Sequence, residues 1–169
     1  MQLPGWKSST VRYSKVIVND EILCMKTVHQ TGLEPNFVHE ITILQQCLHP
    51  FIIWLVGLVT TDNAKVETML MEYVPNAKSL RDRERIDSVE LSRWTQQIKE
   101  GIDYLHKKGC VWGDAKPDNV LIRENGDIVL IDFGGGLTSG WVEQNHYESV
   151  TGDLLAWERI VEFMKTRVT

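Results

Sequence analysis

The sequence has few of the residues that mark several large classes of protein. Its 169 residues include only 3 cysteines, 5 prolines and 12 glycines, which is too little glycine and proline for a low-complexity or fibrous chain. The cysteines, Cys24, Cys47 and Cys110, have no Cys-x-x-Cys spacing and therefore predict reduced thiols rather than a disulfide or zinc framework. With 43% hydrophobic residues, the chain has enough apolar content for the core of one globular domain.

Basic residues and long apolar runs are also scarce. The chain has 18 lysines and arginines against 23 acidic residues, whereas binding to nucleic acid needs a basic surface. Nucleic acid is therefore excluded as an expected partner. The longest apolar run, residues 51–59, is far shorter than the roughly 20 residues that cross a membrane, so it predicts a buried strand and no membrane association. The absence of a signal-peptide pattern predicts an intracellular, cytoplasmic protein.

Hydrophobic periodicity predicts a strand-rich first half. Residues 11–19 and 21–28 form a predicted hairpin, and residues 51–60 and 67–74 form two further predicted strands. Apolar residues at helical spacing predict a helix over residues 34–48. Its apolar face includes Glu40, and an ionised carboxylate there is costly unless it is paired. The helix therefore needs a cation from elsewhere in the fold, unless Glu40 reaches water at the boundary.

The second half is predicted to be built mainly of helices. Residues 78–87 are rich in both signs of charge and indicate a solvated, partly helical connection. Asp87 and Glu90 match a capping box before an apolar stripe, which predicts a helix that ends at Gly109. The last apolar stripe predicts a helix over about residues 153–164.

Between these two helices the sequence predicts a small hairpin. Residues 119–123 and 127–133 flank an Asn-Gly pair, the strongest hairpin signal in the chain. A glycine-rich loop follows at 134–140. Strands first and helices later indicate an α+β fold with a cleft between two lobes.

The stretch with the clearest chemistry is residues 111–122, followed by Asp132-Phe133-Gly134. The hairpin returns Asp132 to the neighbourhood of Asp114, Lys116 and Asn119. Two carboxylates, one amide oxygen and one ammonium group then converge. These groups suit Mg²⁺ bound to phosphate, because Mg²⁺ prefers oxygen ligands and keeps only one or two carboxylates.

These motifs and their spacing resemble the eukaryotic protein kinase family, whose catalytic loop contains Asp-x-Lys-Pro-x-Asn and whose metal loop reads Asp-Phe-Gly. The resemblance implies a single kinase-like two-lobed α+β domain over residues 1–169. Residues 1–74 would form the strand-rich N-lobe and hinge, and residues 75–169 a truncated helical C-lobe. It also implies ATP and Mg²⁺ as cofactors and transfer of the γ-phosphoryl group to a hydroxyl, in the first place on protein Ser/Thr.

The resemblance implies a role for each polar site residue. Asp114 would orient or deprotonate the acceptor hydroxyl, and Lys116 would offset charge on the transferred group. Asn119 and Asp132 would hold Mg²⁺. Lys26 resembles the phosphate-positioning lysine, with Glu40 as the helical glutamate that holds it, and this pair would supply the cation that Glu40 needs.

The resemblance further implies an adenine site between the two lobes. Met71 takes the gatekeeper position, and the backbone of Glu72 and Val74 would face adenine. Apolar side chains that would sandwich the ring are Val11, Cys24 and Leu121. Ordinary core packing would bury these apolar side chains equally well.

The chain departs from the family pattern in four places. Residues 4–9 lack the Gly-x-Gly-x-x-Gly loop, and Trp112-Gly113 replaces His-Arg before the catalytic aspartate. About twenty residues separate Asp132 from Asp153 with no Ala-Pro-Glu between them, and the sequence ends soon after the helix of Asp153. Asp153 either supports the catalytic loop, as in the family, or caps its own helix.

These departures leave three functions open. The first is a protein kinase-type phosphotransferase. The second is an inactive pseudokinase that binds nucleotide or serves as a scaffold, and the third is a kinase-like fold that catalyses another group transfer. The short C-lobe predicts a homodimer or a partner protein that covers it. Trp112 is expected to fill the core, and Trp141 is a candidate contact for substrate or partner.

Overall fold

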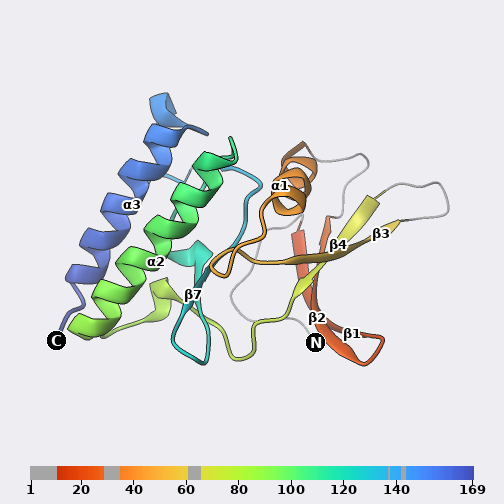
Figure 1. Ribbon diagram of the computed structural model, residues 1–169, viewed down its shortest axis with the longest axis horizontal. Coiled ribbons are helices and arrows are strands. Elements are labelled where there is room, and N and C mark those ends of the chain that lie inside the picture. The colour runs from red at the N-terminus through yellow and green to blue at the C-terminus, as the bar shows by residue number, and fades with distance from the viewer. Residues whose placement is uncertain (1–10, 29–34, 61–65, 137, 142–143) are drawn as a thin grey trace.

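The computed structural model describes residues 11–28, 35–60, 66–136, 138–141 and 144–169. Its first part is a four-stranded antiparallel sheet in the order β1-β2-β4-β3, with helix α1 beside it (Figure 1). The elements are β1 (Val11–Val18), β2 (Glu21–Val28), α1 (Pro35–Gln46), β3 (Leu55–Thr60) and β4 (Val66–Glu72). The predicted first hairpin and the helix are confirmed, and the predicted turn at residues 61–64 lies outside the described residues.

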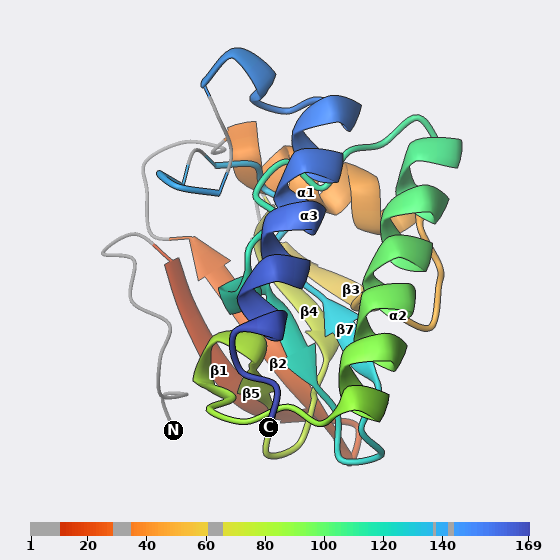
Figure 2. The ribbon, with the colours of Figure 1, turned by 90° about the vertical axis from the view of Figure 1, so that its left-hand side faces the viewer.

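The second part consists of two long antiparallel helices that pack against each other, and a small three-stranded sheet that packs against the first of them (Figure 2). Its main elements are β5 (Lys78–Ser79), α2 (Ser88–Lys107), β6 (Val120–Ile122), β7 (Ile128–Leu130) and α3 (Val150–Lys165). Short 3₁₀ turns lie at Leu80–Asp82, Pro117–Asn119 and Gln144–His146. The α+β class is therefore confirmed. Among the described residues, no helix combines the length and apolar character needed to span a membrane.

The apolar run at residues 51–59 is not the buried strand that the sequence predicts. Strand β3 begins only at Leu55 and lies at the edge of the sheet, so one of its flanks has no neighbouring strand among the described elements. Val56 is 51% exposed. Ile52 and Ile53, the buried part of the run, bridge instead to Leu130 of β7. This stretch joins the two sheets and brings the two parts of the fold together.

Helix α2 begins with the predicted capping box. The Asp87 carboxylate accepts from the backbone N–H groups of Val89 and Glu90, while the Glu90 side chain accepts from the Asp87 N–H. The expectation of a wholly solvated connection before this helix is wrong in one respect. Leu80 and Ile86 are completely buried. These two apolar side chains therefore anchor the charged segment to the core.

Helix α3 begins three residues earlier than predicted. Its N-cap is Ser149, whose hydroxyl accepts from the N–H of Gly152. The interpretation of Asp153 as a helix cap is therefore wrong. Asp153 lies within the first turn and is only 1% exposed, so its carboxylate needs other partners inside the protein.

Candidate active site

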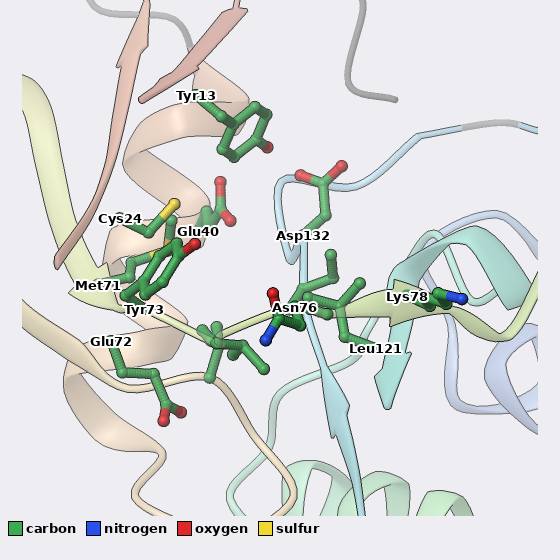
Figure 3. A pocket seen from close by; sticks show the side chains of 14 residues that line it. Tyr13, Cys24, Glu40, Met71, Glu72, Tyr73, Asn76, Lys78, Leu121 and Asp132 are labelled. Carbon is green, nitrogen blue, oxygen red and sulfur yellow. The ribbon is translucent and has the colours of Figure 1, made fainter. Parts of the chain in front are cut away.

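A cavity of about 480 Å³ opens between the four-stranded sheet and the small sheet (Figure 3). Much of its wall is apolar, with side chains that include Met71, Val74 and Leu121. Burial raises the pKa of the Cys24 thiol to about 11, so this side chain is a neutral part of the wall. Glu40 and Asp132 also reach the cavity, which therefore combines apolar surface with acidic groups.

The register of the first hairpin decides which side chains face the cavity. Alternate residues of a strand point to the same face, so Cys24 and Lys26 share one face of β2. Tyr13 lies opposite Lys26 in the ladder and Val11 lies opposite Val28. Tyr13 lines the cavity, whereas Val11 is half-buried and is not among the described lining residues. Sequence reasoning missed Tyr13, although it lies two positions beyond Val11 on the same face.

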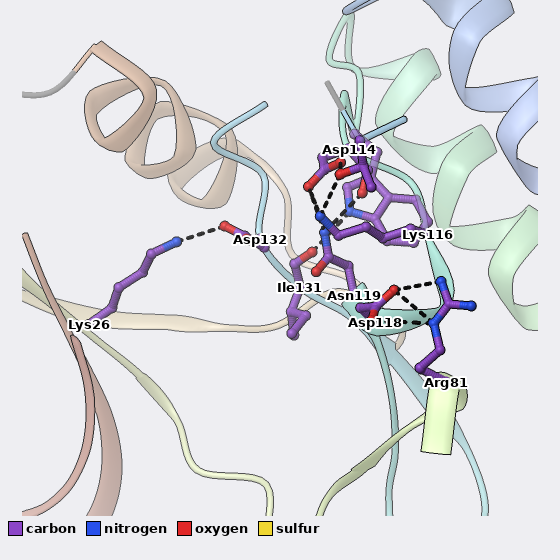
Figure 4. A network of polar contacts seen from close by, with 10 residues as sticks. Lys26, Arg81, Asp114, Lys116, Asp118, Asn119, Ile131 and Asp132 are labelled. Atoms are coloured by element: carbon purple, nitrogen blue, oxygen red, sulfur yellow. Dashed lines mark hydrogen bonds and ion pairs between the residues drawn. The ribbon is translucent and has the colours of Figure 1, made fainter. Parts of the chain in front are cut away.

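Lys26 is the charged centre of the site. Its ammonium lies 2.5 Å from the Glu40 carboxylate. The Asp132 carboxylate lies 2.8 Å from the same ammonium (Figure 4). Burial lowers the pKa of Lys26, but Glu40, Tyr13 and Asp132 raise it by more, so the net pKa is well above its usual range. The lysine is therefore a cation, and the structure provides the partner that the buried Glu40 requires.

The loop after α2 holds Asp114 in a dense set of hydrogen bonds. Its carboxylate accepts from the Lys116 ammonium and, at 2.7 Å, from the Thr138 hydroxyl. The Asn119 amide donates to the Asp114 carbonyl at 2.9 Å, which leaves the Asn119 side-chain oxygen as the atom able to bind a cation. Burial raises the pKa of Asp114, and the bonds from Lys116 and Thr138 offset part of that rise.

Asp153 supports this loop from α3. One carboxylate oxygen accepts from the Trp112 N–H at 2.7 Å and from His106 at 2.8 Å, and the other accepts from the Gly113 N–H at 2.9 Å. Trp112 and Gly113 are the two residues directly before Asp114. The contacts fix the backbone that carries Asp114, as the resemblance implied.

Trp112 and Phe133 connect the two motifs through the core. Both side chains are fully buried, with ring centroids 6.4 Å apart, and the Trp112 indole donates to the Ile131 carbonyl at 2.9 Å. Asp132 follows with a φ of 61°, a left-handed conformation that a non-glycine residue rarely adopts. Its carboxylate turns toward Lys26 (Figure 4). The expectation that Trp112 fills the core is confirmed.

The remaining predicted residues are placed as follows. Glu72 forms a two-bond ion pair with Arg123, at 2.8 and 2.9 Å, and its N–H donates to the Trp54 carbonyl. Glu72 and Val74 both line the cavity. Trp141, the candidate contact for substrate or partner, is half-buried and packs edge-on against Phe163.

Residues 6–161 match the family described as the protein kinase domain. The chain belongs to this family. It is 36% identical over 117 residues to the cAMP-dependent protein kinase catalytic subunit PRKX of Mus musculus, over 68% of this chain and 32% of that protein. It is 32% identical over 125 residues to mitogen-activated protein kinase kinase kinase 17 of Arabidopsis thaliana, over 69% of this chain and 33% of that protein.

A third relative is the serine/threonine-protein kinase SSK22 of Saccharomyces cerevisiae, 35% identical over 136 residues, which cover 75% of this chain and 10% of that protein. The aligned part of the chain thus spans a third or less of the length of these kinases. The fold is accordingly a kinase-like α+β fold, with a strand-rich first part and helices later. The segment at residues 4–9, which takes the place of the glycine-rich loop, lies outside the described residues.

Proposed function

We propose that the chain is an ATP-dependent phosphotransferase that moves the γ-phosphoryl group to a hydroxyl of protein Ser or Thr. The observation that carries the proposal is the position of Lys26, held by both Glu40 and Asp132 at 2.5 and 2.8 Å. Two buried or partly buried carboxylates hold the Lys26 ammonium at one fixed point, and Mg²⁺ bound at Asp132 would offset the net negative charge of the three groups. Such a point suits the phosphates of a nucleotide whose base occupies the adjacent apolar cavity.

In this proposal the apolar side chains Cys24, Met71 and Leu121, which line the cavity, contact adenine, and the backbone of Glu72 and Val74 binds its edge. Asn119 and Asp132 offer oxygen atoms of the kind that Mg²⁺ prefers, and the donor set therefore fits this ion. Bound there, Mg²⁺ would neutralise charge on the phosphates.

The catalytic loop supplies the acceptor chemistry. Asp114 orients the incoming hydroxyl and accepts its proton, and the raised pKa of this carboxyl brings it closer to that of an effective base. Lys116, which contacts Asp114, offsets charge on the transferred group. The relatives include a serine/threonine-protein kinase, which supports a protein Ser/Thr acceptor.

The test combines binding with product analysis. We expect Mg-ATP to raise the melting temperature and to yield ADP together with a phosphorylated acceptor in mass spectra. Asp132→Ala should abolish the thermal shift. Asp114→Asn should keep the shift and lower transfer by roughly 10²–10⁴-fold, the typical contribution of a general base. Lys26→Met, which removes the proposed phosphate contact, should also reduce the thermal shift. Lys99→Met is its matched control, because Lys99 pairs with Asp103 on an exposed helix face.

Two results would contradict the proposal. Binding of Mg-ATP with no turnover across a broad panel of proteins and small molecules indicates a pseudokinase. Release of AMP, or of another product that carries no γ-phosphoryl group, indicates a different group transfer. The homodimer or partner protein that the sequence predicts stays a separate prediction, and light scattering at high protein concentration tests the homodimer.

A further inference from the structure

Cys47 and Cys110 are in contact although they lie in different parts of the fold. Their thiols share a hydrogen bond, and the Cys110 thiol also donates to the Lys108 carbonyl at 3.9 Å. Both are free thiols in the structure, and neither is among the described lining residues of the cavity. The pair is therefore a cluster of two nucleophilic groups that the proposed function does not use.

Each cysteine is placed by the end of a helix. The Cys47 N–H donates to the Ile43 carbonyl at 3.0 Å and so continues the hydrogen bonding of α1 beyond its last residue. The Cys110 N–H donates to the Leu105 carbonyl at 2.9 Å across Gly109, whose φ is 75°. That bond and the left-handed glycine form a C-cap motif that commonly ends a helix, so the end of α2 fixes the backbone of Cys110.

The segments that carry the two cysteines also pack against each other through other side chains. The His49 ring lies 4.7 Å from the Tyr104 ring, measured between centroids, and its Nε2 lies 3.5 Å from the Glu100 carboxylate. His49 is two residues beyond Cys47, whereas Tyr104 and Glu100 belong to α2. The contact between the thiols is therefore supported by a packed junction between the chain after α1 and the last turns of α2.

The two thiols differ in how readily an oxidant reaches them. Cys47 is only 2% exposed, and burial together with the neighbouring Cys110 raises the pKa of its thiol to about 12. Cys110 is only half-buried, and its bond to the Lys108 carbonyl is exposed to solvent. An accessible thiol is oxidised first, and the sulfenic acid that it forms condenses with a second thiol beside it.

We propose that Cys47 and Cys110 are a peroxide-sensitive pair that closes to a reversible disulfide. The Cys110 sulfur, as thiolate, attacks one oxygen of hydrogen peroxide, the O–O bond breaks, and a sulfenic acid forms with release of hydroxide. The Cys47 sulfur then loses its proton and attacks the Cys110 sulfur, whose S–O bond breaks as the oxygen leaves as water. The two thiols together lose two electrons and two protons, and one hydrogen peroxide is reduced to two molecules of water.

The disulfide ties α1 to the chain that leads into the loop of Asp114. Glu40 lies on α1, and Cys110 is two residues before Trp112. Because the thiols already touch while Lys26 binds Glu40, the link keeps this arrangement. It also closes a ring of about sixty residues, which restricts the unfolded chain and raises the melting temperature by about 4–16 °C.

The experiment treats the reduced protein with hydrogen peroxide, blocks the remaining thiols, and identifies the products by peptide mass spectrometry. We expect one blocked thiol, on Cys24, and a linked pair of peptides that carry Cys47 and Cys110. The melting temperature should rise by the amount given above, and hydrogen exchange of the α1 amides should slow. A thiol reductant should reverse all of these changes.

Three variants assign the reaction to this pair. Cys110→Ser removes the accessible thiol at a half-buried position, and should lose both the link and the stabilisation by peroxide. Cys47→Ala should lose the link and leave a sulfenic acid on Cys110, which a cyclic diketone probe labels. Cys24→Ala is the matched control, because it removes the third thiol of the chain, and in this variant the link should form as in the wild type.

The outcomes test the pair and its structural effect separately. Unreacted thiols, sulfinic or sulfonic acid on Cys110 with Cys47 still reduced, a disulfide that involves Cys24, or a disulfide between two copies of the chain overturns the pair. A link between Cys47 and Cys110 that leaves the melting temperature unchanged or lower overturns its role in holding α1. The reaction needs neither nucleotide nor Mg²⁺, so failure of the proposed function leaves this inference standing.

Discussion

Replacing Lys26 with methionine tests the charged centre of the site directly. Methionine keeps an unbranched apolar stem but removes the ammonium that contacts Glu40 at 2.5 Å and Asp132 at 2.8 Å. The Lys26 side chain is 5% exposed and that of Glu40 is 2% exposed. The substitution therefore leaves a carboxylate with no cation in a site that water scarcely reaches.

The expected loss of stability is large. Removing one partner of a buried ion pair typically costs about 3–5 kcal/mol. For a chain of this size each kcal/mol corresponds to about 2–4 °C, so the melting temperature at pH 7.5 should fall by about 6–20 °C. The pKa of Lys26 is raised in the folded protein. Its contribution to the free energy of unfolding is therefore fully present in the wild type below the pKa of lysine in the unfolded chain, about 10.4, and is lost only at higher pH.

The loss should also depend on pH. Burial raises the pKa of Glu40 even in the wild type, where Lys26 lowers it in part, so the pKa rises further in the variant. A carboxyl whose folded pKa is raised contributes stability that is fully present below its unfolded pKa, about 4.3, and is lost as the pH rises through the folded pKa. The variant should therefore lie much closer to the wild type at pH 5 than at pH 7.5.

Urea denaturation at both pH values measures these differences. Lys26→Met combined with Glu40→Gln should be more stable at pH 7.5 than Lys26→Met alone, because no unpaired Glu40 charge remains. Lys99→Met, which breaks the exposed pair with Asp103, should change the free energy of unfolding by about 0.5 kcal/mol or less. A Lys26→Met protein within about 1 kcal/mol of the wild type at pH 7.5 would refute the reasoning.

Three further predictions concern other parts of the site and fold. Asp153→Asn turns an amide toward two buried backbone N–H groups and should lower stability by about 1–3 kcal/mol, measured by urea denaturation. Lys116→Met removes a hydrogen bond that lowers the pKa of Asp114, so the acid limb of the transfer rate against pH should move to higher pH. Gly126 and Gly140 have similar positive φ values, 82° and 88°. A Cβ on Gly126 would collide with the Arg93 guanidinium, whereas a Cβ on Gly140 would meet no atom within 4 Å. Gly126→Ala should therefore lower the melting temperature more than Gly140→Ala.

Much of the site could be predicted because its signals are local. The pattern at residues 111–122 lies on one loop, and the Asn-Gly turn brings Asp132 back over a short distance. The ion pair between Lys26 and Glu40 joins a strand and a helix, and the two residues are fourteen positions apart in the sequence. It was predictable because a carboxylate on an apolar helix face requires a cation, and the requirement can be read from the sequence before the partner is known.

The parts that could not be predicted depend on contacts distant in sequence. An apolar run looks the same whether its strand lies at the centre or at the edge of a sheet, and the order β1-β2-β4-β3 decided that β3 is exposed. Thr138 was missed for a similar reason. Its side chain meets Asp114 across 24 positions, and a single threonine in a glycine-rich loop carries no periodic or motif signal.

The replacement of the family's His-Arg by Trp112-Gly113 illustrates how a motif can change while its support is kept. Asp153 binds the backbone N–H groups of both residues, and any residue except proline supplies an N–H. These two bonds therefore do not restrict the side chain at position 112, whereas Gly113, with a φ of 81°, has a conformation that favours glycine. Trp112 uses this freedom to fill the core and to bind the Ile131 carbonyl directly before Asp132, so the substitution itself fastens the loop of Asp114 to the loop of Asp132.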